Sequence, residues 1–276
     1  MGIETSLSNE GWKLNIHPSA IIDPAADVHE TAVVGPYAVI DAGVTLGPDC
    51  TLAPHVHLTG QTTIGKGNQF HTGAVIGDAP QDVKYDGEPT RLRIGDDNIF
   101  REHVTIHRSN KPDEDTIIGR HNFFMANSHI GHNSLIGDHN IFANGALIGG
   151  HVQIADRAFL SGNALVHQFV RIGTMALMQG GAAASMDVPP FTTVTGVNGL
   201  CGINTIGVRR AGMSPGDRQE LKSSYQSLFR GKGTVTEALK ELRAKVKGEP
   251  ARQLLEFIAD SERGVCGHAS RRAGRD

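Results

Sequence analysis

The chain is poor in the residues on which most compact cores and secreted scaffolds depend. Only 5% of its 276 residues are aromatic and it has a single tryptophan, so we do not expect a core built around aromatic side chains. Its three cysteines are too few and too scattered for a disulfide framework or a Cys-based metal site. It contains neither a signal peptide nor an apolar run of roughly 18 residues. These absences predict a cytoplasmic protein without stable membrane insertion.

A regular repeat is what the sequence does contain. An apolar side chain returns at every sixth residue, and most residues two places earlier are small, as in Ala20, Ala26 and Ala32. The repeat comprises Ile16, Ile22, Val28, Val34, Ile40, Leu46, Leu52, Leu58, Ile64, Phe70, Ile76, Ile94, Phe100, Ile106, Ile118, Phe124, Ile130, Ile136, Phe142, Ile148, Ile154, Leu160, Val166, Ile172 and Met178. Internal repeats of this kind indicate a solenoid.

A six-residue period fits neither an α-helix nor a long alternating strand. It fits one short strand plus a turn, with three such units closing a triangular coil of eighteen residues. We therefore predict a mainly β protein in which residues 15–190 form a parallel β-helix of hexapeptide repeats. Successive coils would stack about 4.8 Å apart, so that residues n and n+18 become neighbours.

Two interruptions break the repeat without changing its register. Residues 78–93 carry Asp82 and Glu88 at positions that should be apolar, and residues 108–116 carry Pro112 at such a position. We predict that 78–93 leaves the coil as an external loop and that 108–116 is a shorter excursion. Ordered excursions from a regular scaffold are often functional.

The regions outside the repeat are expected to differ from it. Residues 1–14 form an N-terminal extension that we expect to be disordered. Residues 191–262 are predicted to be a mostly helical C-terminal domain, because Ser214-Pro215 is typical of a helix start and Leu221, Tyr225 and Leu228 follow at helical spacing. We expect helices over 215–228, 236–246 and 250–261, and a frayed tail over 263–276.

Charge is unevenly distributed along the chain. Its net charge is −3, yet residues 208–248 contain ten Lys and Arg against four Asp and Glu. This basic region suggests an acidic partner.

Histidine is in excess, with fourteen in the chain, and the repeat predicts where each one points. His129 precedes the inward Ile130 and should face outward, while His132 should lie at the corner of the coil. Gly150 follows His132 by eighteen residues, so the histidine should meet a corner that has no side chain. A base beside an open backbone N–H is the pairing that acyl transfer needs.

Other histidines follow the same stacking rule. His151 and His167 should lie on the coils next to His132. His103, His121 and His139 are spaced by eighteen residues. We interpret this second group as a structural ladder.

Several local sequences resemble the UDP-N-acetylglucosamine O-acyltransferases of lipid A synthesis. They are IGDAPQDVKY at 76–85, GEPT at 87–90, TIHR at 105–108, NSHIGH at 127–132, GGH at 149–151 and VHQF at 166–169. The hexads alone are typical of the whole hexapeptide-repeat acyltransferase superfamily. The first and last of these sequences narrow the resemblance to this family, over roughly residues 16–262.

The resemblance implies a left-handed β-helix and a homotrimer with active sites between adjacent chains. It implies transfer of a (3R)-3-hydroxyacyl group from acyl carrier protein to the 3-hydroxyl of UDP-N-acetylglucosamine, the first step of lipid A biosynthesis, with no cofactor, metal or nucleic acid. The acyl-chain length and the use of a 3-amino sugar stay open.

The resemblance also implies residue roles. His132 matches the general base, Gly150 the oxyanion donor, and His129 a residue that orients the reacting groups. The implied substrate contacts are Gln81, Asp82, Lys84, His151, His167, Gln168 and Arg210. Gly180 matches the position that limits acyl-chain length, and acyl carrier protein would dock on basic residues such as Arg209, Arg210, Lys222 and Arg230.

The chain departs from the family pattern after the catalytic histidine. The family often has Asp there, whereas this chain has Asn133. An amide can accept a hydrogen bond from the ring but carries no charge to stabilise imidazolium.

Three other functions remain as alternatives. A trimeric zinc enzyme of the carbonic anhydrase type could use His103 and His107, or His129 and His132, as ligands. The related UDP-glucosamine N-acyltransferase would need an extra N-terminal domain of about a hundred residues, for which residues before Ile16 leave no room. A scaffold without catalytic function would leave the pairing of His132 with Gly150 unexplained.

Overall fold

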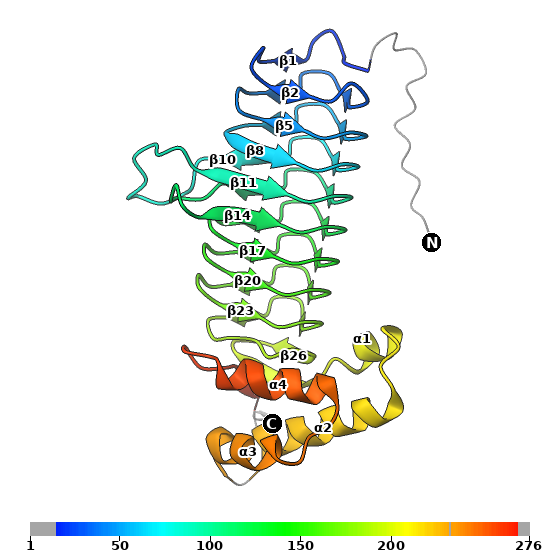
Figure 1. The fold of residues 1–276 in the computed structure, drawn as a ribbon, viewed down its shortest axis with the longest axis vertical. Helices are drawn as coiled ribbons and strands as arrows, with labels where there is room; N and C mark the ends of the chain where they lie inside the picture. Colours follow the sequence, from blue (N-terminus) through cyan, green and yellow to red (C-terminus); the bar gives the residue numbers. More distant parts are fainter. Residues whose placement is uncertain (1–14, 232, 270–276) are drawn as a thin grey trace, which may run out of the picture.

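The computed structural model describes residues 15–231 and 233–269, so the predicted extension over 1–14 lies outside the described residues. The chain winds as a left-handed parallel β-helix of stacked triangular coils, and helices gather at its C-terminal end (Figure 1). This architecture confirms the predicted fold class. Each flat side of the solenoid is one sheet, and we number the sheets 1 to 3.

Sheet 1 has nine strands: β1 (Ile21–Ile22), β4 (Val39–Ile40), β7 (His57–Leu58), β10 (Val75–Asp78), β13 (Thr105–His107), β16 (His129–Ile130), β19 (Leu147–Ile148), β22 (Leu165–Val166) and β25 (Ala183–Ala184). Sheet 2 has eight: β2 (Asp27–Val28), β5 (Thr45–Leu46), β8 (Gln61–Ile64), β11 (Arg91–Ile94), β14 (Asp115–Ile118), β17 (Leu135–Ile136), β20 (Gln153–Ile154) and β23 (Arg171–Ile172).

Sheet 3 has eleven: β3 (Val33–Val34), β6 (Thr51–Leu52), β9 (Gln69–Phe70), β12 (Ile99–Phe100), β15 (Phe123–Phe124), β18 (Ile141–Phe142), β21 (Phe159–Leu160), β24 (Leu177–Met178), β26 (Thr192–Thr195), β27 (Gly199–Ile203) and β28 (Gly267–His268). Its neighbours pair in parallel except β26 and β27, which are antiparallel. The antiparallel pair ends the regular winding.

The register follows the predicted eighteen-residue offset wherever the chain has no excursion. Ile22 pairs with Ile40 and Ile130 with Ile148. Ile76 pairs with Ile106 and Ile106 with Ile130. The larger separations of these last two pairs show that each excursion adds whole hexads, which keeps every apolar side chain inside.

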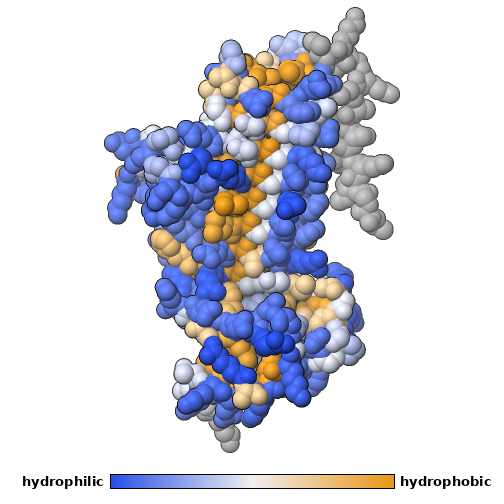
Figure 2. All heavy atoms as spheres, in the orientation of Figure 1, coloured by the Kyte–Doolittle hydropathy of each residue, from blue (hydrophilic) through white to orange (hydrophobic). Residues whose placement is uncertain are grey.

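The core is a column of side chains that repeat from coil to coil. Phe70, Phe100, Phe124 and Phe142 stack with ring centroids 4.7 to 4.9 Å apart, and all four are fully buried. A space-filling view shows apolar side chains in a band along the solenoid, flanked by polar ones (Figure 2). Beneath this surface the buried residues of the coils belong to one continuous apolar cluster.

Most coil corners use a left-handed backbone at the same place in the hexad. This position has a positive φ in Asn133, His151 and Phe169, for example, at 59°, 58° and 66°. One corner carries a ladder of buried asparagines in which the backbone N–H of Asn98 donates to Asn68 Oδ1 at 3.0 Å and that of Asn122 to Asn98 Oδ1 at 2.9 Å. These contacts pair the side-chain oxygens of Asn68 and Asn98 with backbone donors inside the turns.

The predicted external loop is shorter than expected. It spans residues 79–90, because Asp78 ends β10 and residues 91–93 belong to β11, which pairs with β8 over four residues. In the same way the second excursion ends at residue 114, because β14 begins at Asp115. Strands β8, β11 and β14 are longer than their neighbours, and the pairing that extends them draws the loop ends into the sheet.

The helical region contains α1 (Thr205–Arg210), α2 (Pro215–Arg230), α3 (Val235–Arg243) and α4 (Glu249–Ala259). The three expected helices correspond to α2, α3 and α4, whereas α1 was not predicted. Ser214 caps α2 by accepting from the Asp217 N–H, with Pro215 in the first turn. A second apolar cluster packs these helices against the last coil, formed by Phe191, Val208, Leu221, Leu228, Leu254, Leu255 and Ile258.

The prediction of a frayed tail over 263–276 is wrong for residues 263–269. Cys266 is fully buried, and β28 pairs in parallel with β27. His268 Nδ1 lies 3.1 Å from the Tyr225 hydroxyl on α2. The tail is held because it adds one more strand to sheet 3, which protects an exposed sheet edge.

The ladder predicted for His103, His121 and His139 is partly wrong. His121 and His139 stack with ring centroids 4.8 Å apart. His103 lies on another corner, because the excursion between it and His121 raises the local offset to twenty-four residues, as the pairing of Ile99 with Phe123 shows. No helix among the described residues has both the length and the apolar character needed to cross a membrane.

Candidate active site

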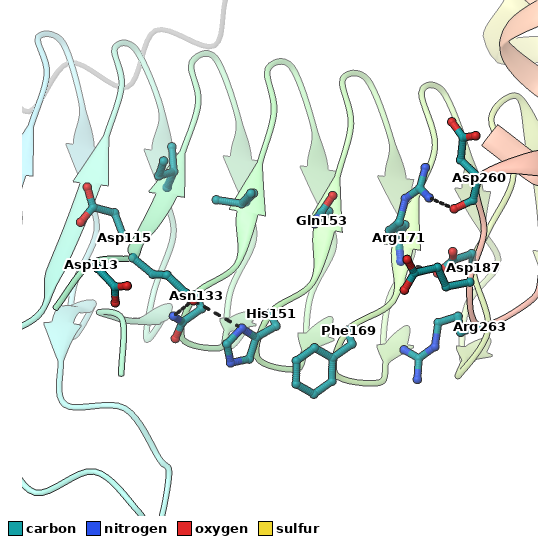
Figure 3. A pocket seen from close by; sticks show the side chains of 14 residues that line it. Asp113, Asp115, Asn133, His151, Gln153, Phe169, Arg171, Asp187, Asp260 and Arg263 are labelled. Atoms are coloured by element: carbon teal, nitrogen blue, oxygen red, sulfur yellow. Dashed lines mark hydrogen bonds and ion pairs between the residues drawn. The ribbon is translucent and has the colours of Figure 1, made fainter. Parts of the chain in front are cut away.

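The predicted catalytic residues meet at one corner of the solenoid, the turn that joins each sheet 1 strand to the following sheet 2 strand. Both excursions leave from this corner, since they connect β10 to β11 and β13 to β14. In successive coils the same place in the turn is held by His132, Gly150 and Gln168. The next residues, Asn133, His151 and Phe169, form a parallel row along the corner (Figure 3).

His132 lies directly against Gly150, as the stacking rule predicts. A Cβ atom on Gly150 would stand only 2.8 Å from His132 Nε2, so the glycine leaves room for the imidazole. Among the backbone hydrogen bonds of the described residues none uses the Gly150 N–H. A ring nitrogen and an unused backbone donor therefore border the same space.

Asn133 holds the other side of the His132 ring. Its Oδ1 lies 2.8 Å from His132 Nδ1 and also accepts from the Asn110 N–H at 3.0 Å. The amide nitrogen donates to Ser109 Oγ at 2.8 Å and to Glu114 Oε2 at 2.7 Å. All four hydrogen-bonding positions of this buried amide are used.

His129 sits beside His132 on the outer side of β16. Its Nδ1 lies 2.8 Å from Thr105 Oγ1, and its ring meets that of His107 edge-on with centroids 4.8 Å apart. Burial, and after it the like charges of the neighbouring His107 and His132, together lower the pKa of His129 to about 4. His129 is thus a neutral imidazole near pH 7.

The 79–90 loop is tied to the corner by two anchors. Arg108 donates to Gly77 O at 2.9 Å and to the Tyr85 hydroxyl at 3.1 Å. Asp82 accepts from the Lys84 N–H at 3.0 Å and from Asn110 Nδ2 at 2.7 Å. These two hydrogen bonds lower the pKa of Asp82, so its carboxylate stays ionised beside His132.

A groove of about 630 Å³ runs along sheet 1 from this corner. Six predicted site residues line it, namely Gln81, His129, His132, Gly150, His167 and Gln168. Leu147, Leu165 and Val197 give it apolar walls. The combination of a base, a backbone donor and an apolar channel suits an acyl chain whose carbonyl is attacked by a hydroxyl.

Four other predicted residues lie around the groove without lining it. Asp82 and Lys84 are on the 79–90 loop, and His151 is on the far side of the corner. Gly180 is at a different corner, where its Cβ position is 3.6 Å from Gly162 O, so these two glycines stack on each other.

Arg210 does not line the groove either. It ends α1, on the side of the solenoid opposite the 79–90 loop (Figure 1). Within one chain it does not reach the groove.

A second groove of about 1030 Å³ lies on the sheet 2 side of the same corner (Figure 3). His151 and Phe169 stack along its rim with centroids 4.7 Å apart, and Arg171 and Arg263 are set among acidic side chains. Burial and the nearby His132 lower the pKa of His151. His132 and Asn133 therefore form the wall between an apolar groove and a charged one.

The sequence reasoning missed the residues of the second excursion. Ser109, Asn110 and Glu114 supply three of the four contacts of Asn133, and Asn110 also links that excursion to Asp82. The interrupted hexads signalled that residues 108–116 leave the coil. Their individual contacts depend on an irregular backbone that no periodicity encodes.

Two family models match parts of the chain. Residues 187–266 match the model described as UDP N-acetylglucosamine O-acyltransferase, domain 2, and residues 115–150 match the bacterial transferase hexapeptide model of six repeats. The first covers the end of the solenoid and the helices, and the second covers coils that carry His132 and Gly150.

Curated relatives resemble the chain over most of its length. The acyl-[acyl-carrier-protein]–UDP-N-acetylglucosamine O-acyltransferase of Akkermansia muciniphila is 51% identical over 255 residues, covering 91% of this chain and 98% of the relative. The enzyme of the same name from Psychromonas ingrahamii is 54% identical over 253 residues, covering 91% and 97%.

Solved structures agree with the relatives. The UDP-N-acetylglucosamine acyltransferase of Francisella novicida superposes with a TM-score of 0.88 at 35% identity, covering 93% of this chain and 95% of that one. The corresponding structure from Moraxella catarrhalis has a TM-score of 0.87 at 37% identity, covering 92% and 100%. These matches favour neither the zinc enzyme nor the N-acyltransferase. The chain is an acyltransferase that belongs to the acyl-[acyl-carrier-protein]–UDP-N-acetylglucosamine O-acyltransferase family.

Proposed function

We propose that this protein transfers a (3R)-3-hydroxyacyl group from acyl carrier protein to the 3-hydroxyl of UDP-N-acetylglucosamine, with His132 as general base and Gly150 as oxyanion donor. The observation that carries this proposal is the contact of His132 Nε2 with the Gly150 corner, where a backbone N–H is unused by the described residues. A base and a donor on adjacent coils can act on the two atoms of one reacting pair.

The reaction proceeds in two balanced steps. His132 Nε2 takes the proton of the sugar hydroxyl as its oxygen bonds to the thioester carbonyl carbon, and the negative charge that forms on the carbonyl oxygen is stabilised by the Gly150 N–H. The tetrahedral intermediate then collapses, the C–S bond breaks, and imidazolium returns the proton to the departing sulfur. The products are an ester and a free thiol.

The surrounding residues take supporting roles. His129, uncharged near pH 7, orients the reacting groups from the groove floor beside His132. Asp82 and Lys84 on the loop contact the sugar, while Gln81, His151, His167 and Gln168 line the path of nucleotide and acyl chain. Gly180 limits the length of that chain.

The active unit is a homotrimer in this proposal. Arg210 does not reach the groove of its own chain, so its role at the nucleotide diphosphate requires a neighbouring chain. Exposed apolar side chains on the solenoid faces, including Ile117, Leu135 and Ile141, are suited to such contacts.

Acyl carrier protein docks on the basic helical region. Arg209, Lys222 and Arg218 border one small groove between α1 and α2, and Arg230 at the end of α2 contacts His268 through Nε at 3.1 Å. Both substrates are water-soluble, so we expect the protein to work in the cytoplasm.

Product analysis tests this function. The purified protein is incubated with UDP-N-acetylglucosamine and a series of 3-hydroxyacyl carrier proteins, with a parallel reaction containing the 3-amino analogue of the sugar. We expect an ester at the 3-hydroxyl, formed at an undiminished rate after treatment with a zinc chelator. Absence of any acylated sugar across the donor series would contradict the proposal, and loss of activity on chelation would favour the zinc enzyme.

A further inference from the structure

The orientation of the Asn133 side-chain amide bears directly on the proposed role of His132. A histidine that works as a base through Nε2 must carry its proton on Nδ1. The group facing Nδ1 therefore has to be an acceptor, and an amide offers either an acceptor or a donor depending on which way it is turned. The direction of the Asn133 amide decides whether His132 can act as a base.

Contacts from the second excursion determine that direction. The Asn110 backbone N–H, which can only donate, meets Asn133 Oδ1 at 3.0 Å. The Glu114 carboxylate, which can only accept, meets Asn133 Nδ2 at 2.7 Å. Both contacts turn Oδ1 towards His132 Nδ1, which lies 2.8 Å away. The proton of the neutral ring is thus on Nδ1, and Nε2 presents its lone pair to Gly150.

Glu114 is held ionised, so it can serve only as an acceptor. Its Oε1 accepts from Lys111 Nζ at 2.7 Å, and this hydrogen bond is the main reason that the pKa of Glu114 lies below its usual range. His151 Nδ1 lies 3.9 Å from Oε2 on the other side. Asn133 and His151, which both contact this carboxylate, lie on adjacent coils (Figure 3).

We propose that Glu114 is a positioning residue that keeps the His132 proton on Nδ1 by fixing the orientation of the Asn133 amide. The inference rests on the proposed role of His132 as general base. Glu114 acts on His132 through the side chain of Asn133. It thereby has the orienting role that an Asp directly after the histidine would have. The excursion over residues 108–114 is the element that brings it there.

A substitution that should lower kcat and a matched control that should not together test this assignment. Glu114→Gln replaces a pure acceptor with a group that can also donate. The Asn133 amide can then rotate so that Nδ2 faces His132, because the substituted side chain could donate a hydrogen bond to Oδ1 in that orientation. We expect kcat to fall about tenfold while the KM for either substrate changes less than twofold. The neighbouring exposed Asp113→Asn is the matched control, since it makes the same chemical change on the same loop, and it should leave kcat within twofold.

The double variant Asn133→Asp with Glu114→Gln separates orientation from loop structure. Asp at 133 presents only acceptors to His132, so kcat should recover to within about threefold of the wild type. Asn133→Asp alone places two carboxylates in contact and should be less active than the double variant. Failure of the double variant to exceed Glu114→Gln would overturn the proposal, because an acceptor at position 133 would not rescue a variant whose loop had lost its anchor.

A spectroscopic readout does not depend on activity. In ¹⁵N spectra of histidine-labelled protein, with His132→Ala used for assignment, the neutral His132 ring should show a protonated Nδ1 in the wild type. The Nε2-protonated form should become populated in Glu114→Gln. An unchanged tautomer in that variant would reject the role of Glu114, whereas a fully active His132→Ala would reject the proposed base and leave the tautomer result standing.

Discussion

Neighbouring histidines at the candidate site differ in their surroundings. The pKa of His129 departs clearly from that of an exposed histidine. Its pKa of about 4 arises chiefly from burial and then from the proximity of His107 and His132. The folded-state pKa is lower than the ordinary value of about 6.5, so the unfolded chain binds more protons between these two pH values. The contribution of His129 to the free energy of unfolding is therefore complete above pH 6.5 and decreases as the pH falls towards 4.

We predict that His129→Gln flattens this part of the pH–stability curve. The unfolding free energy is measured by urea titration at pH 7, 5.5 and 4.5. It should fall less steeply with decreasing pH in the variant, because unfolding takes up about one proton fewer at most. His107 and His151 also have lowered pKa values, so a residual slope should persist. Parallel curves for the two proteins would show that His129 does not titrate in this range.

Residue positions on the coil could be predicted well, but residue contacts on the loops could not. The six-residue period fixes which way His129 and His132 point, because strand and turn positions repeat without regard to the neighbouring sequence. Ser109, Asn110 and Glu114 gain their contacts from one irregular loop conformation. The length of that loop also misled the prediction for His103, which lost its partners when the local offset grew by a hexad.

At the scale of elements, the close stacking of coils is the feature on which the site depends. Gly131 shows how little space there is, because a Cβ atom on it would lie 2.7 Å from the backbone of Gly149. At Gly150 the added atom would meet the His132 ring at 2.8 Å, and that ring is held by Asn133. A side chain at this corner therefore displaces the proposed base.

We expect Gly150→Ala to reduce kcat by roughly 10² to 10³, comparable to the loss of an oxyanion donor. The φ of Gly150 is not positive, so the backbone tolerates alanine and the melting temperature should change little. Gly216→Ala in α2 is a suitable control, since its Cβ meets only Ser214 Oγ at 3.8 Å. Wild-type activity in Gly150→Ala would show that the corner is not where the chemistry occurs.

Elements outside the repeat were predicted less completely. The cap and spacing signals of α2 are explicit in Ser214, Pro215 and Leu221, and the helix begins where they indicate. Helix α1 is only six residues long and β28 only two, so neither shows a period that a sequence pattern could reveal. Both are stabilised by tertiary contacts with the last coils.

At the scale of the whole molecule, one chain holds a groove but not every residue proposed to bind the nucleotide. The solenoid faces carry exposed apolar side chains, and Arg210 is an exposed residue at the end of α1 that does not line its own groove. Assembly of three chains would bring such an arginine to a neighbour's site. Oligomerisation and activity should then be linked.

We predict a solution mass three times that of one chain by light scattering, with specific activity falling on dilution once trimers dissociate. Arg210→Ala should raise the KM for the nucleotide sugar and leave the mass unchanged. A fully active monomer would contradict this arrangement. A wild-type KM in Arg210→Ala would show that Arg210 does not bind the nucleotide sugar, and it would leave the prediction of a trimer unaffected.

The proposed mechanism depends most on His132 as the general base, and one comparison of kcat values tests that role directly. His132→Ala and His139→Ala are measured beside the wild type with saturating UDP-N-acetylglucosamine and acyl carrier protein donor. His139 is the matched control, a turn histidine of the same solenoid that stacks on His121 away from the groove. We predict a loss of roughly 10² to 10⁴ for His132→Ala and less than twofold for His139→Ala. A His132→Ala variant that turns over at the wild-type rate would contradict the account.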